Sequence, residues 1–365
     1  MQARAQSTTE APNRVAYLSD WIEERLGERP DMGSFVQSTT GFSAETLYAN
    51  LPTANGEKLV IRLEKPGGEV FMDSDIALQG QVMVEMARNG VPVPPVVGIE
   101  TDATKIGSRF LVMRHVPGRC FPTRPNFLQD GWVKDLPADR QRRVWESSMA
   151  LLGQINRLEP RDGFEFLARP QYGAAGIDQY IGAARAWRRT VLGDKSNRVL
   201  DAALDYLEAN KPPGLPVNLL WGDANPGNIL YTDQQTVGAA LDFEAAALGP
   251  AEADLGWWLF MERNRSVGFD RLPGMPSREE CTAMYSQALG RTAVAVEYFE
   301  ILGGFRMSMV IASTVEQLGR MDLMPQGTDA AEANPMLRTL SGLLDNEPPQ
   351  IGSGFHAFVK AVTSR

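Results

Sequence analysis

The spacing of apolar residues in the first third of the chain predicts a helix followed by a β-hairpin. Residues 15–26 carry an apolar side chain at every third or fourth position, and Gly27 should end that helix. Two β-rich runs, residues 46–51 and 58–63, flank the Asn55-Gly56 dipeptide. Asn-Gly between two such runs is typical of a tight hairpin turn.

A second helix and a buried strand complete the first third. Residues 66–75 predict a loop, and residues 76–89 predict a helix that Gly90 ends. The prolines of residues 91–95 favour an extended backbone. The four apolar residues Phe110–Met113 then predict a buried strand.

From residue 119 onward the pattern becomes mainly helical. Apolar side chains between Val144 and Leu158 fall on one helix face, and the acidic residues of segment 135–139 can begin that helix. Further helices are expected at residues 177–190, 197–209, 253–263, 278–289 and 295–319. Short β elements are expected at residues 217–220, 229–231 and 237–241. Residues 322–350 are loosely patterned and predict a loop-rich segment.

The two kinds of pattern together predict an α+β protein with two lobes and a cleft between them. We expect a β-rich N-terminal lobe over residues 13–113 and a connector over residues 114–118. The helical C-terminal lobe would then cover residues 119–365. The small and polar residues 1–12 are expected to form a disordered lead.

Composition narrows the class of protein. The 365 residues are 43% apolar and 22% charged, which is ordinary for a soluble globular protein. The net charge of −9 argues against a nucleic-acid partner, which would require a basic face. No signal peptide and no membrane-spanning run is present. We therefore expect a cytoplasmic protein with neither nucleic-acid nor membrane partners.

The sequence lacks the residues that several classes of enzyme need for catalysis. The two histidines, His115 and His356, form no zinc-protease motif, and the two cysteines have no metal-like spacing. The chain contains no P-loop, no Rossmann glycine motif and no G-x-S-x-G elbow. Zinc hydrolysis and esterase chemistry are therefore disfavoured.

An acidic motif in residues 221–228, WGDANPGN, carries the most specific chemistry. Asp223 precedes Asn228 by five positions, and Asp242 follows fourteen positions later. One carboxylate that orients a hydroxyl, with an amide oxygen and a second carboxylate that hold Mg²⁺, is an arrangement suited to phosphoryl transfer. The alternative is an acidic hairpin, because Asp and Asn are common in turns.

At these residues the sequence resembles the aminoglycoside phosphotransferase-like kinases. The branch related to the kinase domain of acyl-CoA dehydrogenase-associated proteins often reads W-G-D-x-x-x-G-N-x-[IL], followed by L-D-[WF]-E-x-A-x-L-G-P-x-E-x-D-L-[GA]-W. This chain reads WGDANPGNIL and LDFEAAALGPAEADLGWW. The resemblance extends from about Thr39 to Met309 and implies a protein-kinase-like, two-lobe fold.

The resemblance also implies an activity. We expect an ATP- and Mg²⁺-dependent kinase that phosphorylates a hydroxyl of a small molecule, such as an aminoglycoside-like antibiotic or a hydroxylated metabolite or hydroxyacyl compound. Asp223 would be the general base, and Asn228 and Asp242 would bind the metal. A catalytically silent, nucleotide-binding pseudokinase is the alternative.

The residues around the acidic motif have less specific interpretations. Glu244 would face the acceptor if the strand before it continued, or would otherwise be a supporting or surface acid. Trp221, where most relatives have histidine, should pack behind the loop. Asp254 is expected to cap a helix, and Trp257 and Trp258 are expected to be core residues.

Other candidate residues concern the nucleotide. Ser43, in the loop before the first hairpin strand, matches a phosphate-binding position of the family. Arg62 stands where kinases usually carry a lysine, and Gln79 stands where its glutamate partner is expected. Arg62 could instead be a solvated charge on an edge strand, and a slip of register would make Glu85 the partner.

The connector should hold adenine through its backbone. By the resemblance, the carbonyl of Arg114 and the amide of Val116 would bind the adenine edge, with Met113 at the back of the pocket. His115 is expected to face solvent. The acceptor pocket would use residues 170–190 and 295–315. Within the second segment Arg306 could bind an anionic acceptor or pair with a nearby acid.

Overall fold

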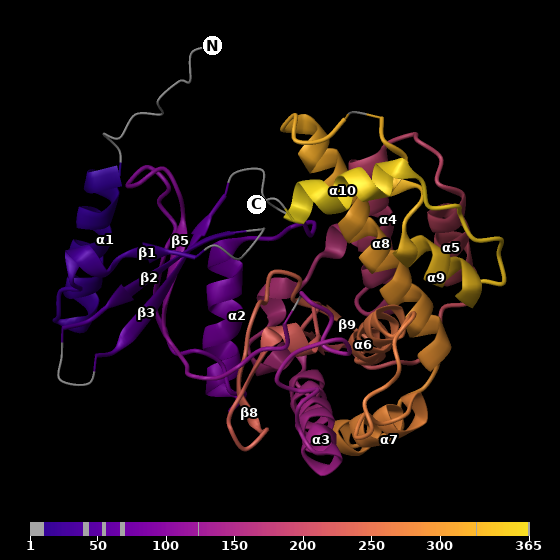
Figure 1. Ribbon diagram of the computed structural model, residues 1–365, viewed down its shortest axis with the longest axis horizontal. Coiled ribbons are helices and arrows are strands. Elements are labelled where there is room, and N and C mark those ends of the chain that lie inside the picture. Colours follow the sequence, from indigo (N-terminus) through magenta and orange to yellow (C-terminus); the bar gives the residue numbers. More distant parts are fainter. Residues whose placement is uncertain are drawn as a thin grey trace. The chain divides into compact units, whose positions relative to one another are not determined.

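The computed structural model describes residues 11–38, 44–52, 56–65, 70–122, 124–325 and 327–363 (Figure 1). Ser43 and Asn55 lie outside the described residues. Most of the predicted lead also lies outside them, but Ala11 and Pro12 belong to the first helix.

Contacts divide the chain into two compact units. The first unit comprises residues 1–69, 73–84 and 94–116, and the second comprises residues 70–72, 85–93 and 117–365. The predicted lobe boundaries stay predictions.

The first unit contains a five-stranded antiparallel sheet in the order β1-β2-β3-β5-β4. The strands are β1 (Val36–Gln37), β2 (Ala44–Asn50), β3 (Lys58–Glu64), β4 (Val96–Glu100) and β5 (Phe110–Arg114). The predicted hairpin and the predicted buried strand are confirmed. β4 was not predicted, because all five of its residues are half-buried and show no alternation of apolar and polar positions.

Helix α1 (Ala11–Leu26) packs on one face of this sheet (Figure 1). Its fully or nearly fully buried residues Leu18, Trp21 and Ile22 share a core with strand residues such as Leu59. The helix ends at Gly27, whose φ of +71° suits a residue without a side chain. A short 3₁₀ turn, η1 (Met32–Ser34), leads to β1.

Helix α2 (Ile76–Arg88) begins at a cluster of charges. The Asp75 carboxylate accepts hydrogen bonds from the backbone N–H groups of Ala77 and Leu78 at 2.7 and 3.1 Å. Arg109 binds Asp75 at 2.6 Å and Glu64 at 2.5 Å, and so ties the start of α2 to the end of β3. Gly90 follows the helix at φ +74°, as predicted.

The second unit is mainly helical. Its helices are α3 (Ala138–Asn156), α4 (Ile177–Leu192), α5 (Arg198–Ala209), α6 (Glu252–Arg265), α7 (Arg278–Leu289), α8 (Val296–Arg320), α9 (Pro335–Leu343) and α10 (Ser353–Thr363). Short 3₁₀ turns occur at η2 (Pro160–Asp162), η3 (Glu165–Leu167), η4 (Pro170–Tyr172), η5 (Pro226–Asn228) and η6 (Asp329–Ala331). The six predicted helices are confirmed. The predicted loop-rich segment over residues 322–350 also contains the helix α9, which was not predicted.

Two small antiparallel sheets lie within this helical unit. β6 (Asn218–Leu220) pairs with β9 (Ala247–Gly249), and β7 (Ile229–Tyr231) pairs with β8 (Val237–Ala240). β9 was not predicted, because three residues are too few to show a period. The chain therefore runs from β6 in one small sheet through the acidic motif to β7 and β8 in the other, and then back to β9 in the first sheet.

Helices α6 and α8 cross closely at two glycines. A Cβ atom at Gly256 would overlap the carbonyl group of Phe299, and one at Gly303 would lie 2.8 Å from the carbonyl oxygen of Gly256. Gly319, near the end of α8, has no atom within 4 Å of the same position. The backbones of α6 and α8 thus touch, and this contact fixes the side chains on both helices.

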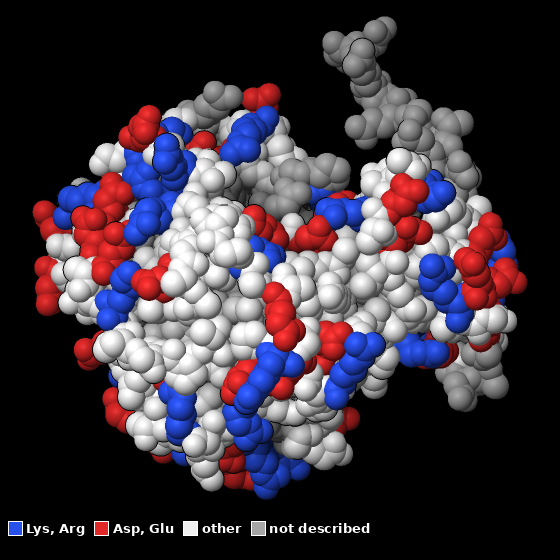
Figure 2. Space-filling view, turned by 180° about the vertical axis from the view of Figure 1, so that it is seen from behind, with Lys and Arg blue, Asp and Glu red and all other residues white. Residues whose placement is uncertain are grey.

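The described surface is mixed in charge. On the face shown in Figure 2, acidic and basic residues are interspersed, and neither sign forms one continuous patch. Across the described ranges, no helix combines the length and apolarity needed to cross a bilayer.

We predict that Gly256→Ala lowers the free energy of unfolding by about 1–3 kcal/mol, because the added methyl group forces α6 and α8 apart. Gly319→Ala is the matched control and should be neutral or stabilising by up to about 1 kcal/mol. Urea unfolding followed by circular dichroism measures both. Equal effects of the two substitutions would contradict the close crossing.

Candidate active site

The acidic motif forms a tight loop between β6 and β7. Gly222 has a φ of +86°, and a Cβ atom there would overlap the carbonyl oxygen of Ala245. Asn225 then begins the turn η5, because its side-chain oxygen accepts a hydrogen bond from the Gly227 N–H at 2.9 Å. The predicted tight turn at Pro226-Gly227 is confirmed, and it returns Asn228 to Asp223.

Three N–H groups donate to the Asp223 carboxylate. Asn228 Nδ2 donates to Oδ2 at 2.8 Å, and Asn225 Nδ2 donates to Oδ1 at 3.0 Å. The Trp257 indole N–H also donates to Oδ1, at 3.1 Å. These donors fix the carboxylate in one orientation. Asn225 and Trp257 were not predicted as site residues, although an Asn immediately before a proline is a recognisable turn signal.

Burial raises the pKa of Asp223 to about 6, and the nearby negative charge of Asp242 adds to the effect. The hydrogen bond from Asn228 and the positive charges of Arg306 and Arg265 oppose this rise. A carboxyl with this pKa is mostly ionised at neutral pH but binds a proton more readily than an exposed aspartate. Such a value suits a group that accepts a proton.

Asp242 is held beside the loop in a left-handed backbone conformation, with φ +59°. The Leu241 N–H donates to the carbonyl of Asn228 at 2.8 Å. The Trp221 indole N–H donates to the carbonyls of Leu241 and Asp242 at 2.9 and 3.1 Å. Trp221 is fully buried, so its predicted packing behind the loop is confirmed.

The donor set around Asp223 fits a hard divalent cation. Asn228 uses its amide nitrogen to reach Asp223, which leaves its amide oxygen as the atom for a metal. Asp242 supplies a carboxylate, and its repulsion of Asp223 would be offset by a cation. Oxygen ligands of this kind suit Mg²⁺. The assignment of Asn228 and Asp242 as ligands stays a prediction.

Glu244 does not lie on a strand, so the argument that placed it toward the acceptor is wrong. β8 ends at Ala240, and Glu244 occupies a turn in which the Ala246 N–H donates to the carbonyl of Phe243 at 3.1 Å. Alternation along a strand therefore says nothing about its direction. Its proposed role toward the substrate is left without that support.

Asp254 was expected to cap a helix, and this expectation is wrong. The residue before α6 is Ala251, and it makes no side-chain capping bond. The fully buried Asp254 instead accepts hydrogen bonds from the backbone N–H groups of Trp221 and Gly222, at 2.7 and 2.9 Å. It fixes the backbone immediately before Asp223.

The Asp254 carboxylate belongs to a larger buried network. Asn156 of α3 donates to it at 2.8 Å and to the carbonyl of Leu219 at 2.9 Å. Tyr285 of α7 donates to Asn156 Oδ1 and to the carbonyl of Ala251, both at 2.9 Å. Residues from α3, α6, α7 and β6 are joined in this way.

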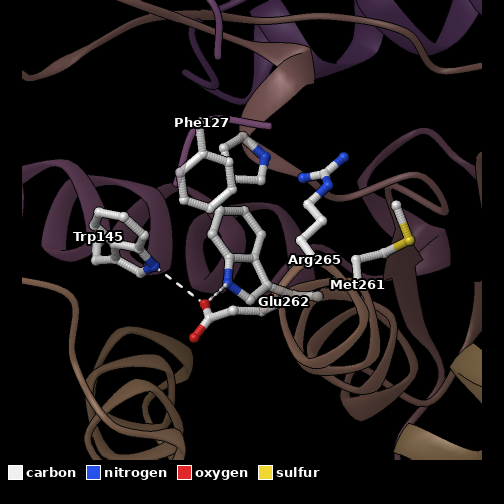
Figure 3. A pocket seen from close by; sticks show the side chains of 7 residues that line it. Phe127, Trp145, Met261, Glu262 and Arg265 are labelled. Carbon is white, nitrogen blue, oxygen red and sulfur yellow. Dashed lines mark hydrogen bonds between the residues drawn. The ribbon is translucent and has the colours of Figure 1, made fainter. Parts of the chain in front are cut away.

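Trp257 and Trp258 are buried, so their predicted core positions are confirmed. The Trp258 indole N–H donates to Glu262 at 3.3 Å, in a small pocket of about 10 Å³ (Figure 3). The Arg265 side chain in this pocket points away from the Glu262 carboxylate. The space is that of about one water molecule, so it is too small for an acceptor.

In the first unit, Arg62 lies on the central strand β3, opposite Thr46 of β2 and Leu111 of β5. Its interpretation as an edge-strand charge is therefore wrong. Gln79 on α2 is buried. The contact proposed between Arg62 and Gln79 stays a prediction. Glu85 pairs with Arg88 at 2.6 Å.

The predicted connector begins at Arg114, the last residue of β5, and Met113 precedes it on the same strand. Met113 is buried, and the Arg114 side chain pairs with Glu57. The His115 side chain is exposed, as predicted, and the backbone N–H of His115 donates to the carbonyl of Lys58 at 2.8 Å. The N–H of Val116 donates to no residue in the described ranges. Their adenine contacts stay predictions.

The chain matches a family model described as the phosphotransferase enzyme family over residues 38–293. This match covers well over half of the chain, and the chain belongs to that family. Asp223, Asn228 and Asp242 lie within the matched residues. The membership confirms the recognised resemblance.

Individual relatives and solved structures agree with the family. Human acyl-CoA dehydrogenase family member 11 is 24% identical over 313 residues, which cover 79% of this chain and 37% of that protein. The chain thus spans little more than a third of this relative's length.

A Ralstonia eutropha JMP134 protein assigned as an aminoglycoside phosphotransferase has a TM-score of 0.69 and 20% identity, with 90% of this chain and 98% of that chain covered. Macrolide 2′-phosphotransferase MphH from Brachybacterium faecium has a TM-score of 0.58 and 17% identity, with coverages of 87% and 96%. These likenesses confirm the predicted α+β, protein-kinase-like fold.

We predict that Asp254→Ala lowers the free energy of unfolding by at least about 2 kcal/mol, because the N–H groups of Trp221 and Gly222 lose their buried acceptor. The matched control is Asp139→Ala in the first turn of α3, where the side chain is 69% exposed. It should change stability by less than about 0.5 kcal/mol. Urea unfolding compares them, and similar losses would contradict the anchoring role of Asp254.

Proposed function

We propose that this chain is an ATP- and Mg²⁺-dependent phosphotransferase that transfers the γ-phosphoryl group to a hydroxyl of a small molecule. The observation that carries the proposal is the Asp223 carboxylate, which three N–H donors orient beside Asn228 and Asp242. Family membership supports the class of reaction.

Asp223 orients the acceptor hydroxyl and accepts its proton. Oδ1 already accepts two hydrogen bonds, from Asn225 and Trp257, whereas Oδ2 accepts one, from Asn228. Each carboxylate oxygen accepts about two hydrogen bonds, so the remaining position is on Oδ2. The acceptor hydroxyl therefore donates to Oδ2. In a loose transition state this orientation matters more than early deprotonation.

Asn228 and Asp242 would hold the metal through the Asn228 amide oxygen and the Asp242 carboxylate. When bound, Mg²⁺ neutralises charge on the phosphate oxygens. Solved structures of the same fold support nucleotide binding. One aminoglycoside phosphotransferase forms a ternary complex with ADP and hygromycin B, and an aminoglycoside 2′-phosphotransferase forms a complex with GDP.

The first unit supplies the proposed nucleotide contacts. Ser43 and Arg62 would bind phosphate, with Gln79 beside Arg62. Arg114 and Val116 would bind the adenine edge through their backbone, with Met113 behind the ring. The N–H of Val116, which donates to no described residue, is the feature of this set that supports such a contact.

A catalytically silent, nucleotide-binding pseudokinase is the second candidate. One observation favours it: Arg62 and Gln79 stand where active kinases usually carry a lysine and its glutamate partner. Turnover with an acceptor separates the two candidates.

The experiment is a screen of hydroxylated metabolites and antibiotics for acceptor-stimulated release of ADP. With an acceptor in hand, Asp223→Asn should lower kcat about a hundredfold to ten-thousandfold, because the amide cannot accept the hydroxyl proton. The dissociation constant for ATP, measured by calorimetry, should stay within about twofold of the wild type.

Asp233→Asn is the matched control for this substitution, because the Asp233 side chain is 89% exposed in the turn between β7 and β8. It should leave turnover unchanged. A folded Asp223→Asn variant with nearly full turnover would show that the base is assigned to the wrong residue. Parallel loss of melting temperature and activity would make Asp223 a structural residue.

We also predict an acidic limb in the pH dependence of kcat/KM, with an apparent pKa of about 6, because Asp223 must be ionised to accept the proton. Trp257→Phe removes a donor to the ionised carboxylate, so the limb should move to higher pH. ATP titrates identically with both enzymes, so the difference between them reports on Asp223.

Trp258→Phe is the matched control for the pH prediction, because the Trp258 indole donates to Glu262 and not to Asp223. Its acidic limb should coincide with that of the wild type. Identical limbs in the Trp257 and Trp258 variants would contradict the assignment of this limb to Asp223.

A further inference from the structure

The indole ring of Trp257 lies between Asp223 and a buried arginine, Arg306. Arg306 on α8 has only 6% of its surface exposed. Its guanidinium carbon lies 4.7 Å from the ring centre of Trp257, 5.6 Å from that of Tyr180 and 6.0 Å from that of Phe71. All four residues belong to the second unit. We call this group the Arg306 cluster.

Two side chains of the Arg306 cluster, those of Arg306 and Tyr180, lack hydrogen-bond partners among the residues that the structure describes. Arg306 forms no ion pair and no hydrogen bond with them, and its Nη1 atom is fully buried. The hydroxyl of Tyr180 is also buried without a hydrogen-bond partner. Buried polar groups are nearly always hydrogen-bonded, and a buried charge without a partner costs several kcal/mol. These two donors therefore require an explanation.

Pairing with a nearby acid does not supply that explanation. Glu300, the acid nearest to Arg306 in sequence on the same helix, is bound by Arg263 at 2.6 Å and Arg278 at 2.9 Å. Both oxygens of Asp254 are occupied by the network described above. The charge of Arg306 acts on Asp254 and Asp223 only at longer range, where it lowers the pKa of each.

Trp257 connects the Arg306 cluster to the candidate base. Its indole N–H donates to Asp223 Oδ1 at 3.1 Å, while its ring lies against the Arg306 guanidinium. A ligand that reached both Arg306 and Asp223 would therefore span about the width of one indole. The close crossing of α6 and α8 holds Trp257 and Arg306 in these positions.

We propose that the acceptor is a short hydroxylated anion, whose carboxylate or phosphate oxygens bind Arg306 and the Tyr180 hydroxyl while its hydroxyl meets Asp223. The proposal rests on the phosphotransferase function proposed above. Both groups are hydrogen-bond donors, and an arginine fork matches two anionic oxygens. Burial raises the pKa of Tyr180 to about 12, so its hydroxyl keeps its proton and can donate.

The reaction with such an acceptor is balanced. The acceptor oxygen forms a bond to the γ-phosphorus of ATP, the bond from that phosphorus to the bridging oxygen of ADP breaks, and the hydroxyl proton passes to Asp223. The products are a phosphate ester that retains the original anionic group, and ADP. Ammonium-bearing acceptors are disfavoured, because a cation already occupies the aromatic ring faces.

The test compares acceptors that differ only in charge. The probes are 3-hydroxybutanoate, 4-hydroxybutanoate and 5-hydroxypentanoate, each against its neutral amide, with glycerol 3-phosphate against glycerol as the phosphate arm. We expect kcat/KM to favour at least one anion over its neutral counterpart by about tenfold or more, because the neutral compound leaves the buried donors unpaired. The anion with the larger preference in kcat/KM shows whether the site binds a carboxylate or a phosphate.

Variants assign the preference to residues. Arg306→Gln should reduce the preference for the anion to about onefold, and Arg306→Lys should restore part of it, because an ammonium lacks the guanidinium fork. Tyr180→Phe removes only the hydroxyl and should raise KM for the anion several-fold. Arg320→Gln, at the exposed end of the same helix, is the matched control and should keep the full preference.

A second measurement does not depend on turnover. Butanoate lacks the hydroxyl and should bind to the wild-type chain in calorimetry, and Arg306→Gln should abolish that binding. If Arg306→Gln does not fold, Tyr180→Phe carries the test in both measurements. Absence of butanoate and glycerol 3-phosphate binding, in a chain that binds nucleotide, overturns the proposal.

Other outcomes separate this proposal from the function on which it rests. Preferred phosphorylation of amides or amino alcohols overturns the anion site and leaves the phosphotransferase function standing. Failure to bind nucleotide overturns the function itself. If Arg306→Gln shifts the acidic limb of Asp223 but keeps the preference for the anion, Arg306 is only a counter-charge and the proposal is wrong.

Discussion

The geometry of the site depends on one buried carboxylate, that of Asp254. It accepts hydrogen bonds from the backbone N–H groups of Trp221 and Gly222 and from the side-chain amide of Asn156. These bonds join the loop that carries Asp223 to helices α6 and α3. Burial raises the pKa of Asp254, and these hydrogen bonds oppose the rise. The conformation of the loop and the position of this buried acceptor therefore stabilise each other.

Helix α6 acts on the loop a second time through Trp257, three residues after Asp254 and on the same helix face. Asp254 holds the backbone before Asp223, and Trp257 holds the Asp223 carboxylate. The other side of the same indole meets Arg306 of α8. One helix thus sets the position of the candidate base and its distance from a buried cation.

Most of the fold could be predicted from the sequence, because long helices with one apolar face and an Asn-Gly hairpin are local signals. β9 could not, since its three residues form a strand only by pairing with β6. The proximity of Asn228 and Asp242 to Asp223 could also be predicted from their spacing in the sequence. The true role of Asp254 could not be predicted, because an acid in the first turn of a helix is normally a cap. The backbone N–H groups that donate to it lie more than thirty positions away in the sequence.

The central claim is that the residues around Asp223 form a phosphoryl-transfer site. The most direct measurement is a calorimetric titration of the non-hydrolysable ATP analogue AMP-PNP into the wild-type chain, with and without Mg²⁺. We predict saturable binding to one site per chain, with higher affinity when Mg²⁺ is present. Absence of nucleotide binding under both conditions would contradict it.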